Sequence, residues 1–364
     1  MKLTCNRDKF STLFSLAAAV VSAKDIKAVL QNVKMTVKSN KLILDATDMD
    51  NSIRLVLDEV DILDEGETIL PTRMMKNVIQ ESNADILEIS LEDEKLTVRA
   101  GNAFYQFPTQ PVEEFPEIPP FESEAYHEVQ GKVLLDHIRR TSFAIDLENS
   151  KYTLSGVLFE LTEGRIATVS TDGRRLANQE GVATAYGGHF SENSAIVPLK
   201  ALNLVEKAFG QTAEPVKIAI EEGKITFATS NITISARLVE GRFPRWKNIL
   251  PNKLERTKVD IAVSALYQCV RQTAFLATDS QPGVILHFEA GQLEITATGE
   301  GNSAVPTPIS YDSEPIEVKL DPHYLSDFLR CLPSEAILSI YLKEKQSVLF
   351  ETNDGYSYVL MPLA

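Results

Sequence analysis

The sequence is poor in cysteine and has no long apolar run. Its three cysteines, Cys5, Cys269 and Cys331, lie far apart and form no CxxC pair. This spacing argues against a zinc site and against a disulfide framework, so we expect no metal and a reducing compartment. No stretch approaches the roughly 18 apolar residues of a membrane helix. We therefore expect a cytoplasmic protein, and the apolar segment 11–23 is interpreted as an amphipathic helix because Asp8 precedes it where a signal peptide is basic.

Recognisable catalytic motifs are also missing. The segment GEGNSA at 299–304 lacks the third glycine of a dinucleotide-binding loop and the helix that should follow it. No GxSxG, HExxH or kinase-like set occurs. We expect no cofactor and no catalytic residues. One alternative stays open: the TDGRR turn at 171–175 could serve an enzyme together with acidic neighbours, although Asp-Gly is first of all a turn signal.

Positive charge is in short supply over the whole chain. Lys and Arg number 36 against 51 Asp and Glu, which gives a net charge of −15. Phosphate groups need Lys and Arg, so this balance is unfavourable for binding nucleic acid. Net charge describes the whole surface and not one face of it. A DNA-binding protein of this composition would need its basic residues gathered on one side.

What the sequence does contain is one order of elements, repeated three times. Each repeat opens with a strand that runs into an amphipathic helix, at 2–21, 127–145 and 258–277. Alternating strands around a polar turn follow, at 41–57, 165–179 and 292–309. A second helix starts at a proline, at 71–82, 198–210 and 321–333. Hairpins close each repeat, at 85–107, 216–238 and 336–362.

The spacing of the repeats is regular. The turns at Asp48, Asp172 and Gly299 lie 124 and 127 residues apart, and the prolines that open the second helices keep a similar period. Extended Pro-rich segments at 108–120 and 241–251 separate the repeats. The fold class is therefore expected to be α+β, with three similar domains of two helices packed on antiparallel sheets. The expected domains are residues 1–120, 121–250 and 251–364.

Four motifs resemble a known family in both order and spacing. They are STDGRRLA (170–177), SAIVPLKAL (194–202), RLVEGRFPRWKNILP (237–251) and YSYVLMPLA (356–364). The chain resembles the bacterial DNA sliding clamp, the β subunit of replicative DNA polymerase III. The resemblance implies a head-to-tail homodimer that forms a closed ring of six domains around double-stranded DNA. Such a ring tethers the polymerase for processive synthesis and catalyses nothing.

The resemblance also gives the basic residues a place. Two helices per domain would line the hole, and they carry Arg7, Lys9, Arg73, Lys76, Arg139, Arg140, Lys200, Lys207, Arg271 and Arg330. Weak contacts with phosphate, independent of sequence, would let the ring slide. The expected DNA-binding residues are Lys24, Arg73, Lys76, Tyr152, Lys200 and Lys207. The family's DNA-contacting loops are altered here, since DIKAVLQ replaces a proline-containing stretch after Lys24 and Glu148 places an anion near Tyr152.

A partner-peptide pocket and a dimer interface carry over by resemblance as well. The pocket residues are Leu154, Thr171, Gly173, Arg174, Arg175, Leu176, Pro244, Ile249, Val359, Leu360, Met361, Pro362 and Leu363. Arg174 and Asn248 depart from the family, where histidine and arginine are common. The expected partners of the pocket are the polymerase's catalytic subunit, the clamp loader and repair proteins that share a short peptide motif. Across the dimer interface, Tyr105 and Phe107 would meet Phe275 and Leu276. A structural or adaptor dimer with no DNA function is the remaining alternative.

Overall fold

The computed structural model describes residues 1–364 apart from 59, 149–151, 191–194, 211, 222, 279–281, 300 and 364. The chain forms two compact units. Unit 1 comprises residues 1–132, 184–190 and 200–238, and unit 2 comprises 133–183, 191–199 and 239–364. Each unit is described by itself. In the part of the chain that the structure describes, no helix is long and apolar enough to cross a membrane.

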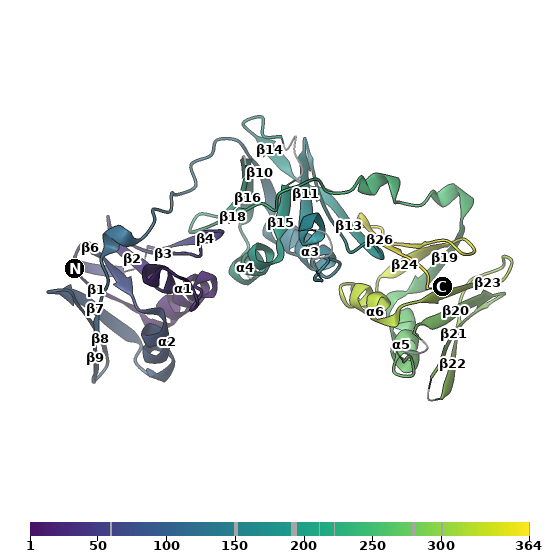
Figure 1. The fold of residues 1–364 in the computed structure, drawn as a ribbon, viewed down its shortest axis with the longest axis horizontal. Coiled ribbons are helices and arrows are strands. Elements are labelled where there is room, and N and C mark those ends of the chain that lie inside the picture. The colour runs from purple at the N-terminus through teal and green to yellow at the C-terminus, as the bar shows by residue number, and fades with distance from the viewer. Residues whose placement is uncertain are drawn as a thin grey trace. The chain divides into compact units, whose positions relative to one another are not determined.

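Unit 1 contains two antiparallel sheets (Figure 1). The larger, in spatial order, consists of β14 (Thr184–Tyr186), β10 (Tyr126–Gln130), β16 (Pro215–Glu221), β17 (Lys224–Ala228), β18 (Ile232–Arg237), β4 (Asn51–Leu57), β3 (Lys41–Thr47), β2 (Val33–Lys38) and β6 (Gly66–Leu70). The smaller consists of β5 (Val60–Asp64), β1 (Lys2–Asn6), β7 (Ile86–Glu92), β8 (Lys95–Ala100) and β9 (Ala103–Pro108). The larger sheet is continuous across two repeats, because β4 of the first repeat pairs with β18 of the second.

Unit 2 is built in the same way. Its larger sheet consists of β15 (Ala195–Pro198), β11 (Gly156–Thr162), β12 (Arg165–Thr171), β13 (Arg175–Val182), β26 (Tyr356–Leu360), β25 (Val348–Glu351), β24 (Ile337–Leu342) and β19 (Thr257–Ala262). The smaller consists of β22 (Asn302–Pro308), β21 (Gln292–Thr298), β20 (Val284–Glu289) and β23 (Ile316–Leu320). Here β13 of the second repeat pairs with β26 of the third.

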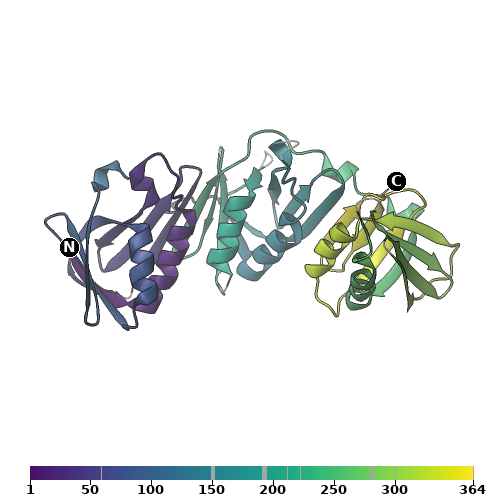
Figure 2. The same ribbon diagram turned by 60° about the horizontal axis from the view of Figure 1, so that its bottom comes forward.

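The six helices of the described residues occur where the repeat predicts them. They are α1 (Arg7–Val20), α2 (Thr72–Glu81), α3 (Gly131–Ser142), α4 (Leu199–Phe209), α5 (Val263–Ala274) and α6 (Pro322–Arg330). Their starts have local causes: the Asn6 side chain accepts the N–H groups of Asp8 and Lys9, both at 3.0 Å. Asp321 caps α6 in the same way, and Pro322 fills the first helical position. Figure 2 shows α1 and α2 side by side in unit 1, where α1 packs on β3 and β4.

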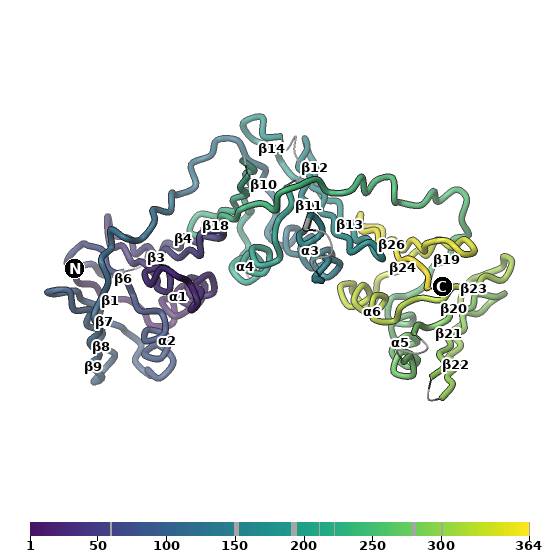
Figure 3. The backbone as a smooth tube through the Cα atoms, in the orientation of Figure 1, coloured from purple at the N-terminus to yellow at the C-terminus, as the bar shows by residue number. Residues whose placement is uncertain are grey.

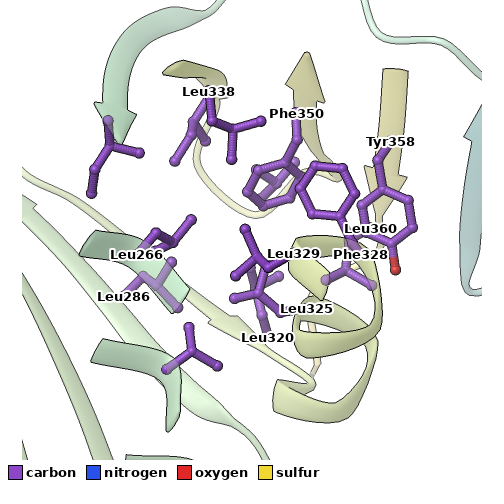
Figure 4. Close-up of a cluster of buried hydrophobic side chains, with 14 of the residues drawn as sticks. Leu266, Leu286, Leu320, Leu325, Phe328, Leu329, Leu338, Phe350, Tyr358 and Leu360 are labelled. Atoms are coloured by element: carbon purple, nitrogen blue, oxygen red, sulfur yellow. The ribbon is translucent and has the colours of Figure 1, made fainter. Parts of the chain in front are cut away.

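A large apolar core in unit 2 lies between its helices and sheets. Figure 4 shows Phe328 of α6 between Phe350 of β25 and Tyr358 of β26, with Leu266 and Leu286 nearby. The rings of Phe328 and Tyr358 are stacked, with centroids 4.5 Å apart. Burial of each such side chain stabilises the fold by about 1.5–3 kcal/mol. This core therefore holds α6 against β25 and β26 within the third repeat.

The α+β class, the antiparallel pairing and the threefold order of elements are confirmed. The two units do not follow the predicted boundaries after residues 120 and 250, because each larger sheet takes strands from two repeats. The second repeat is therefore shared between the two compact units. The division into three domains stays a prediction.

Candidate functional site

The turn between β12 and β13 is fixed by four hydrogen bonds. Thr171 Oγ1 donates to the Arg175 carbonyl at 2.6 Å and accepts the Gly173 N–H at 3.1 Å. Asp172 Oδ1 accepts the N–H groups of Arg174 and Arg175, at 2.9 and 3.0 Å. Gly173 has a φ of +89°, a conformation that costs glycine little. The Asp172 carboxylate thus has a structural role in the turn, which weakens the alternative that it works as a catalytic acid or base.

The two adjacent arginines of this turn have different environments. The Arg175 side chain is only 9% exposed and donates to Asp172 at 3.0 Å, to Asp327 at 2.9 Å and to the Phe143 carbonyl at 2.7 Å. Its guanidinium also lies 4.2 Å from the centre of the Tyr324 ring. Arg174 is exposed, and a hydrogen bond with Tyr324 raises its pKa. Only Arg174 is placed to meet a partner directly.

The C-terminal segment lies against this turn. In the register of β13 and β26, Leu176 stands opposite Val359 and Arg175 opposite Leu360. After the strand ends, the Met361 N–H donates to the Arg174 carbonyl at 2.9 Å and the Leu363 N–H to the Lys319 carbonyl at 2.8 Å. Figure 3 shows the end of the chain running along unit 2 beyond β26. Pro362 and Leu363 are half-buried and Met361 is exposed, so this tail offers apolar side chains beside Arg174.

A small apolar cluster forms the floor below the turn. Leu154, Leu176 and Val359 are buried together with Phe243 and Trp246. Two further predicted residues, Pro244 and Ile249, flank Trp246 in the segment 241–251 and are exposed. Trp246 is fixed by an Nε1 hydrogen bond of 3.1 Å to Glu160. Buried apolar side chains with exposed apolar neighbours and a few polar groups are the usual build of a peptide-binding site.

Leu360 is placed differently from its neighbours in the predicted pocket. Successive side chains of a strand point to opposite faces of the sheet. Val359 therefore joins the cluster below the turn, whereas Leu360 is buried in the core around Phe328. The Leu360 side chain supports the pocket from the opposite face of the sheet and does not line it.

A cavity of about 380 Å³ adjoins the exposed side of the turn. Its lining residues are Ile145, Asp146, Leu147, Glu148, Asp172, Arg174, Arg175 and Tyr324. Tyr324, like Asp327, belongs to α6. Both α6 residues contact the turn's arginines and were missed by the sequence prediction. The sequence does predict α6, from the proline at its start. No local feature of the sequence, however, indicates that α6 contacts residues some 150 positions earlier.

Some of the predicted DNA-binding residues are exposed, and others form ion pairs or hydrogen bonds within the chain. Arg73 and Lys76 are exposed on α2, and Lys24 is exposed in the turn after α1. Lys200 forms an ion pair with Asp48, and Lys207 donates to the Ser15 carbonyl at 3.1 Å. The two lysines of α4 thus hold α4 to elements of the first repeat within unit 1. Tyr152 begins a short 3-10 turn, Tyr152–Leu154, and its side chain lies outside the described residues.

Arg140 does not belong to the basic surface expected of the helices. It is buried and forms a 2.7 Å ion pair with Asp354, a 2.8 Å hydrogen bond to Gln179 and a contact of 5.3 Å with the Tyr356 ring. Burial of a charge is tolerated when it is paired and hydrogen-bonded in this way. Arg140 is a structural residue that joins α3 to the hairpin before β26.

The predicted interface residues lie near sheet edges. Tyr105 and Phe107 are half-buried on β9, an edge strand, and their rings stack with centroids 6.4 Å apart. In unit 2, Phe275 follows α5 and is 75% exposed. Leu276 is half-buried against the unit 2 core. The edge strand of the nearby sheet is β22, whose side chains alternate between exposed and half-buried.

Residues 1–119 match the family described as DNA polymerase III beta subunit, N-terminal domain, and residues 128–245 match the central domain of the same subunit. The chain belongs to the bacterial sliding clamp family. Family members are processivity factors and not catalytic enzymes. The predictions of this family, and of a protein that is not an enzyme, are therefore confirmed.

The likeness extends over the full length of the relatives. A beta sliding clamp of Pseudomonas putida is 28% identical, and that of Escherichia coli is 24% identical; each alignment covers all of both proteins. The crystal structure of the DNA polymerase III subunit beta from Pseudomonas aeruginosa covers both chains completely, with a TM-score of 0.90 at 26% identity. A second structure of the clamp from that organism, bound to griselimycin, has a TM-score of 0.90 and covers 100% of this chain and 99% of its own.

Proposed function

We propose that the protein is a DNA sliding clamp of the replicative polymerase. Two chains would close head to tail into a ring around duplex DNA, and the ring would tether the polymerase without catalysing a reaction. Family membership over the whole length of clamp relatives supports this most strongly. The three repeats would then be three clamp domains with the predicted boundaries, and the protein would act in the cytoplasm.

The free sheet edges support head-to-tail closure. Strand β9 ends one sheet of unit 1, and β22 ends one sheet of unit 2, so both leave backbone groups unpaired within the chain. Exposed edges with apolar neighbours tend to pair with another chain. A contact between two different surfaces generates a closed ring when the rotation allows it. Phe275 would supply an apolar anchor beside such an edge.

The basic residues on the helices support a DNA-facing surface. Arg73 and Lys76 are exposed on one helix of unit 1, although the chain as a whole carries a charge of −15. Positive side chains inside a ring with an acidic exterior would attract a threaded phosphate backbone and keep other DNA away. Contacts of this type are weak, salt-dependent and independent of base sequence.

The cluster beneath the turn of 171–176 would bind short peptides of the polymerase, the clamp loader and repair proteins. Leu176 and Val359 form its floor, Arg174 its polar edge and Met361 an adaptable wall. The griselimycin-bound clamp of Pseudomonas aeruginosa is a relative known to accept a bound ligand. One pocket shared by several partners suits a protein that recruits different enzymes in turn.

Retention on DNA of different topology tests the proposal. After loading by a clamp loader, the protein should co-elute with nicked circular plasmid and should be lost once the plasmid is linearised. Light scattering on the same preparation should give twice the 40.3 kDa chain mass. An adaptor without DNA function would be dimeric but would elute apart from both DNA forms. Equal retention on linear and circular DNA would contradict the ring.

A further inference from the structure

A cavity of about 330 Å³ lies on one face of the larger sheet of unit 2. It is lined by β13, β25, β26 and the segment 250–253. Side chains two residues apart on a strand share a face of the sheet, so Asn178 lies on the same face of β13 as Leu176. Leu349 belongs both to this cavity and to the cluster that contains Leu176. The cavity therefore adjoins the proposed peptide pocket, but none of the predicted pocket residues lines it.

Asn178 is the feature of this cavity that the fold does not explain. Its side chain lines the cavity and is 2% exposed. The Oδ1 atom has no hydrogen-bond partner, and no hydrogen bond of this side-chain amide occurs among the described residues. A buried polar group without a partner destabilises a fold, and such groups are therefore nearly always bonded. An amide at this position makes sense if it bonds to a ligand.

The other polar side chains around the cavity already have partners within the described part of the chain. The pairs are Glu351 with Lys253 and Ser357, Glu180 with Arg165, Thr352 with Asp354, and Tyr356 with the Arg140 carbonyl. Both carboxylates and the lysine that line the cavity are thus compensated. A charged ligand would leave water without meeting a free counter-charge, which is unfavourable. The lining therefore favours a neutral ligand.

The rest of the lining provides apolar surface. Leu349 is fully buried on β25, and Leu250 and Pro251 are half-buried in the segment across the cavity. An apolar group of the size of an aromatic ring can pack between these side chains while a polar group meets Asn178. Apolar walls with a few unpaired polar groups, in a space of about 300–1,000 Å³, are typical of small-molecule sites.

We propose that this cavity binds a small neutral molecule that carries a carboxamide next to an apolar ring. A carboxamide matches the Asn178 side chain because each amide offers an N–H donor and a C=O acceptor side by side. A carboxylate lacks the donor, and an ammonium or amidinium group lacks the acceptor. The proposal does not rest on DNA binding, on ring closure or on the peptide pocket.

The test compares three ligands of one shape: neutral benzamide, the anion benzoate and the cation benzamidinium. Binding to the full-length chain is followed by NMR of its leucine and valine methyl groups. Benzamide should shift the methyl signals of Leu250, with a dissociation constant in the millimolar range that suits so few atoms. Benzoate and benzamidinium should bind at least about fivefold more weakly, because neither finds a free counter-charge.

Replacement of the unpaired amide supplies the decisive comparison. Asn178→Leu should weaken benzamide at least about fivefold, since the ligand's amide then has no partner. The unfolding midpoint should not fall, because an apolar side chain of similar size replaces an amide that bonds to nothing in the fold. The matched control is Asn51→Leu, which replaces another buried asparagine that does not line the cavity. This control should bind benzamide as the parent does.

A glutamine side chain of another protein has the same chemistry as a free carboxamide. A capped tripeptide with a central glutamine therefore serves as a fourth ligand. It should bind more weakly than benzamide, because it has no ring to pack between Leu250 and Leu349. The opposite order would overturn the assignment to a small molecule.

Three further results would contradict the proposal. Equal affinity of benzamide for the parent and for Asn178→Leu would show that the amide is not recognised. Signals that shift only at Leu176 and Val359 would place benzamide in the peptide pocket. No shift at about 10 mM benzamide would exclude even weak binding. Retention of Asn178→Leu on nicked circular plasmid should equal that of the parent, which keeps this outcome separate from the clamp function.

Discussion

Substitutions of the adjacent residues Arg174 and Arg175 should have different effects: the first should weaken peptide binding, and the second should lower the stability of the fold. Arg175→Met removes hydrogen bonds to Asp172, Asp327 and the Phe143 carbonyl and leaves the half-buried Asp172 carboxylate without its cation. Each bond to a charged group is worth about 1.5–3 kcal/mol, but the three share one guanidinium and are not additive. Asp327 is partly exposed and regains water. We expect a loss of about 3–4 kcal/mol, close to the cost of breaking a buried ion pair.

A loss of this size is measurable by thermal unfolding. Units of this length shift their midpoint by about 2–4 °C for each kcal/mol, so Arg175→Met should unfold roughly 6–16 °C earlier. Arg175→Lys should recover less than half of the loss, because an ammonium cannot reproduce the planar donors. Arg174→Ala should leave the midpoint unchanged, since Arg174 is exposed.

For peptide affinity we expect the opposite ranking of the two variants: Arg174→Ala should be the more affected. Calorimetry well below the midpoint, with a short partner peptide that carries leucine and phenylalanine side chains, should find a weaker affinity for Arg174→Ala and a near-parental affinity for Arg175→Met. The reasoning would be refuted if Arg175→Met kept its midpoint and lost the peptide. That result would make Arg175 a direct ligand contact and not a structural residue.

Three further outcomes are expected. Phe275→Asp should give monomers by light scattering without loss of stability, because Phe275 is 75% exposed in the single chain, whereas Leu254→Asp, at a residue 95% exposed and outside the proposed interface, should stay dimeric. Arg73→Ala, Lys76→Ala should lower DNA affinity uniformly across sequences and reduce its dependence on salt, which titrations at several salt concentrations will measure. Burial lowers the pKa of His137 to about 3. Below pH 6.5 the unfolded chain therefore binds a proton at this position that the folded chain does not, and stability falls as the pH drops towards 3, by up to about 1.4 kcal/mol per unit; denaturant titrations of His137→Gln should show a shallower loss between pH 6.5 and 4, and an equally steep loss would contradict the assignment.

The helices and hairpins could be predicted because their causes are local. Apolar periodicity, a capping Asn6 and the prolines at 71 and 322 act within one turn of the residues that they order. The pairing of β4 with β18 and of β13 with β26 has no such signal, since each joins strands of different repeats. The two compact units therefore do not coincide with the repeats.

The same limit applies to the two buried arginines. Arg140 was expected among the basic residues of the lining helices, and Arg175 among the pocket residues, and neither expectation included the carboxylate that the fold brings to it. Their partners, Asp354 and Asp327, lie 214 and 152 residues further along the chain. A buried arginine is recognisable in a sequence only when the fold that brings its carboxylate is already known. The side chain of Leu360 lies in the core around Phe328 for a simpler reason, the alternation of faces along β26.

The repeated turn, at residues 47–51 and 171–175, shows what its aspartate does. Asp48 and Asp172 accept the same two backbone N–H groups, so the aspartate serves the turn in both places. A Thr-Asp turn is thus no sign of catalysis, which removes the main support for an enzyme. The side chains that differ between the two turns, Asp50 against Arg174, are exposed and bear opposite charges. The two repeats therefore share the backbone hydrogen bonds of the turn and differ in the charge that the turn exposes.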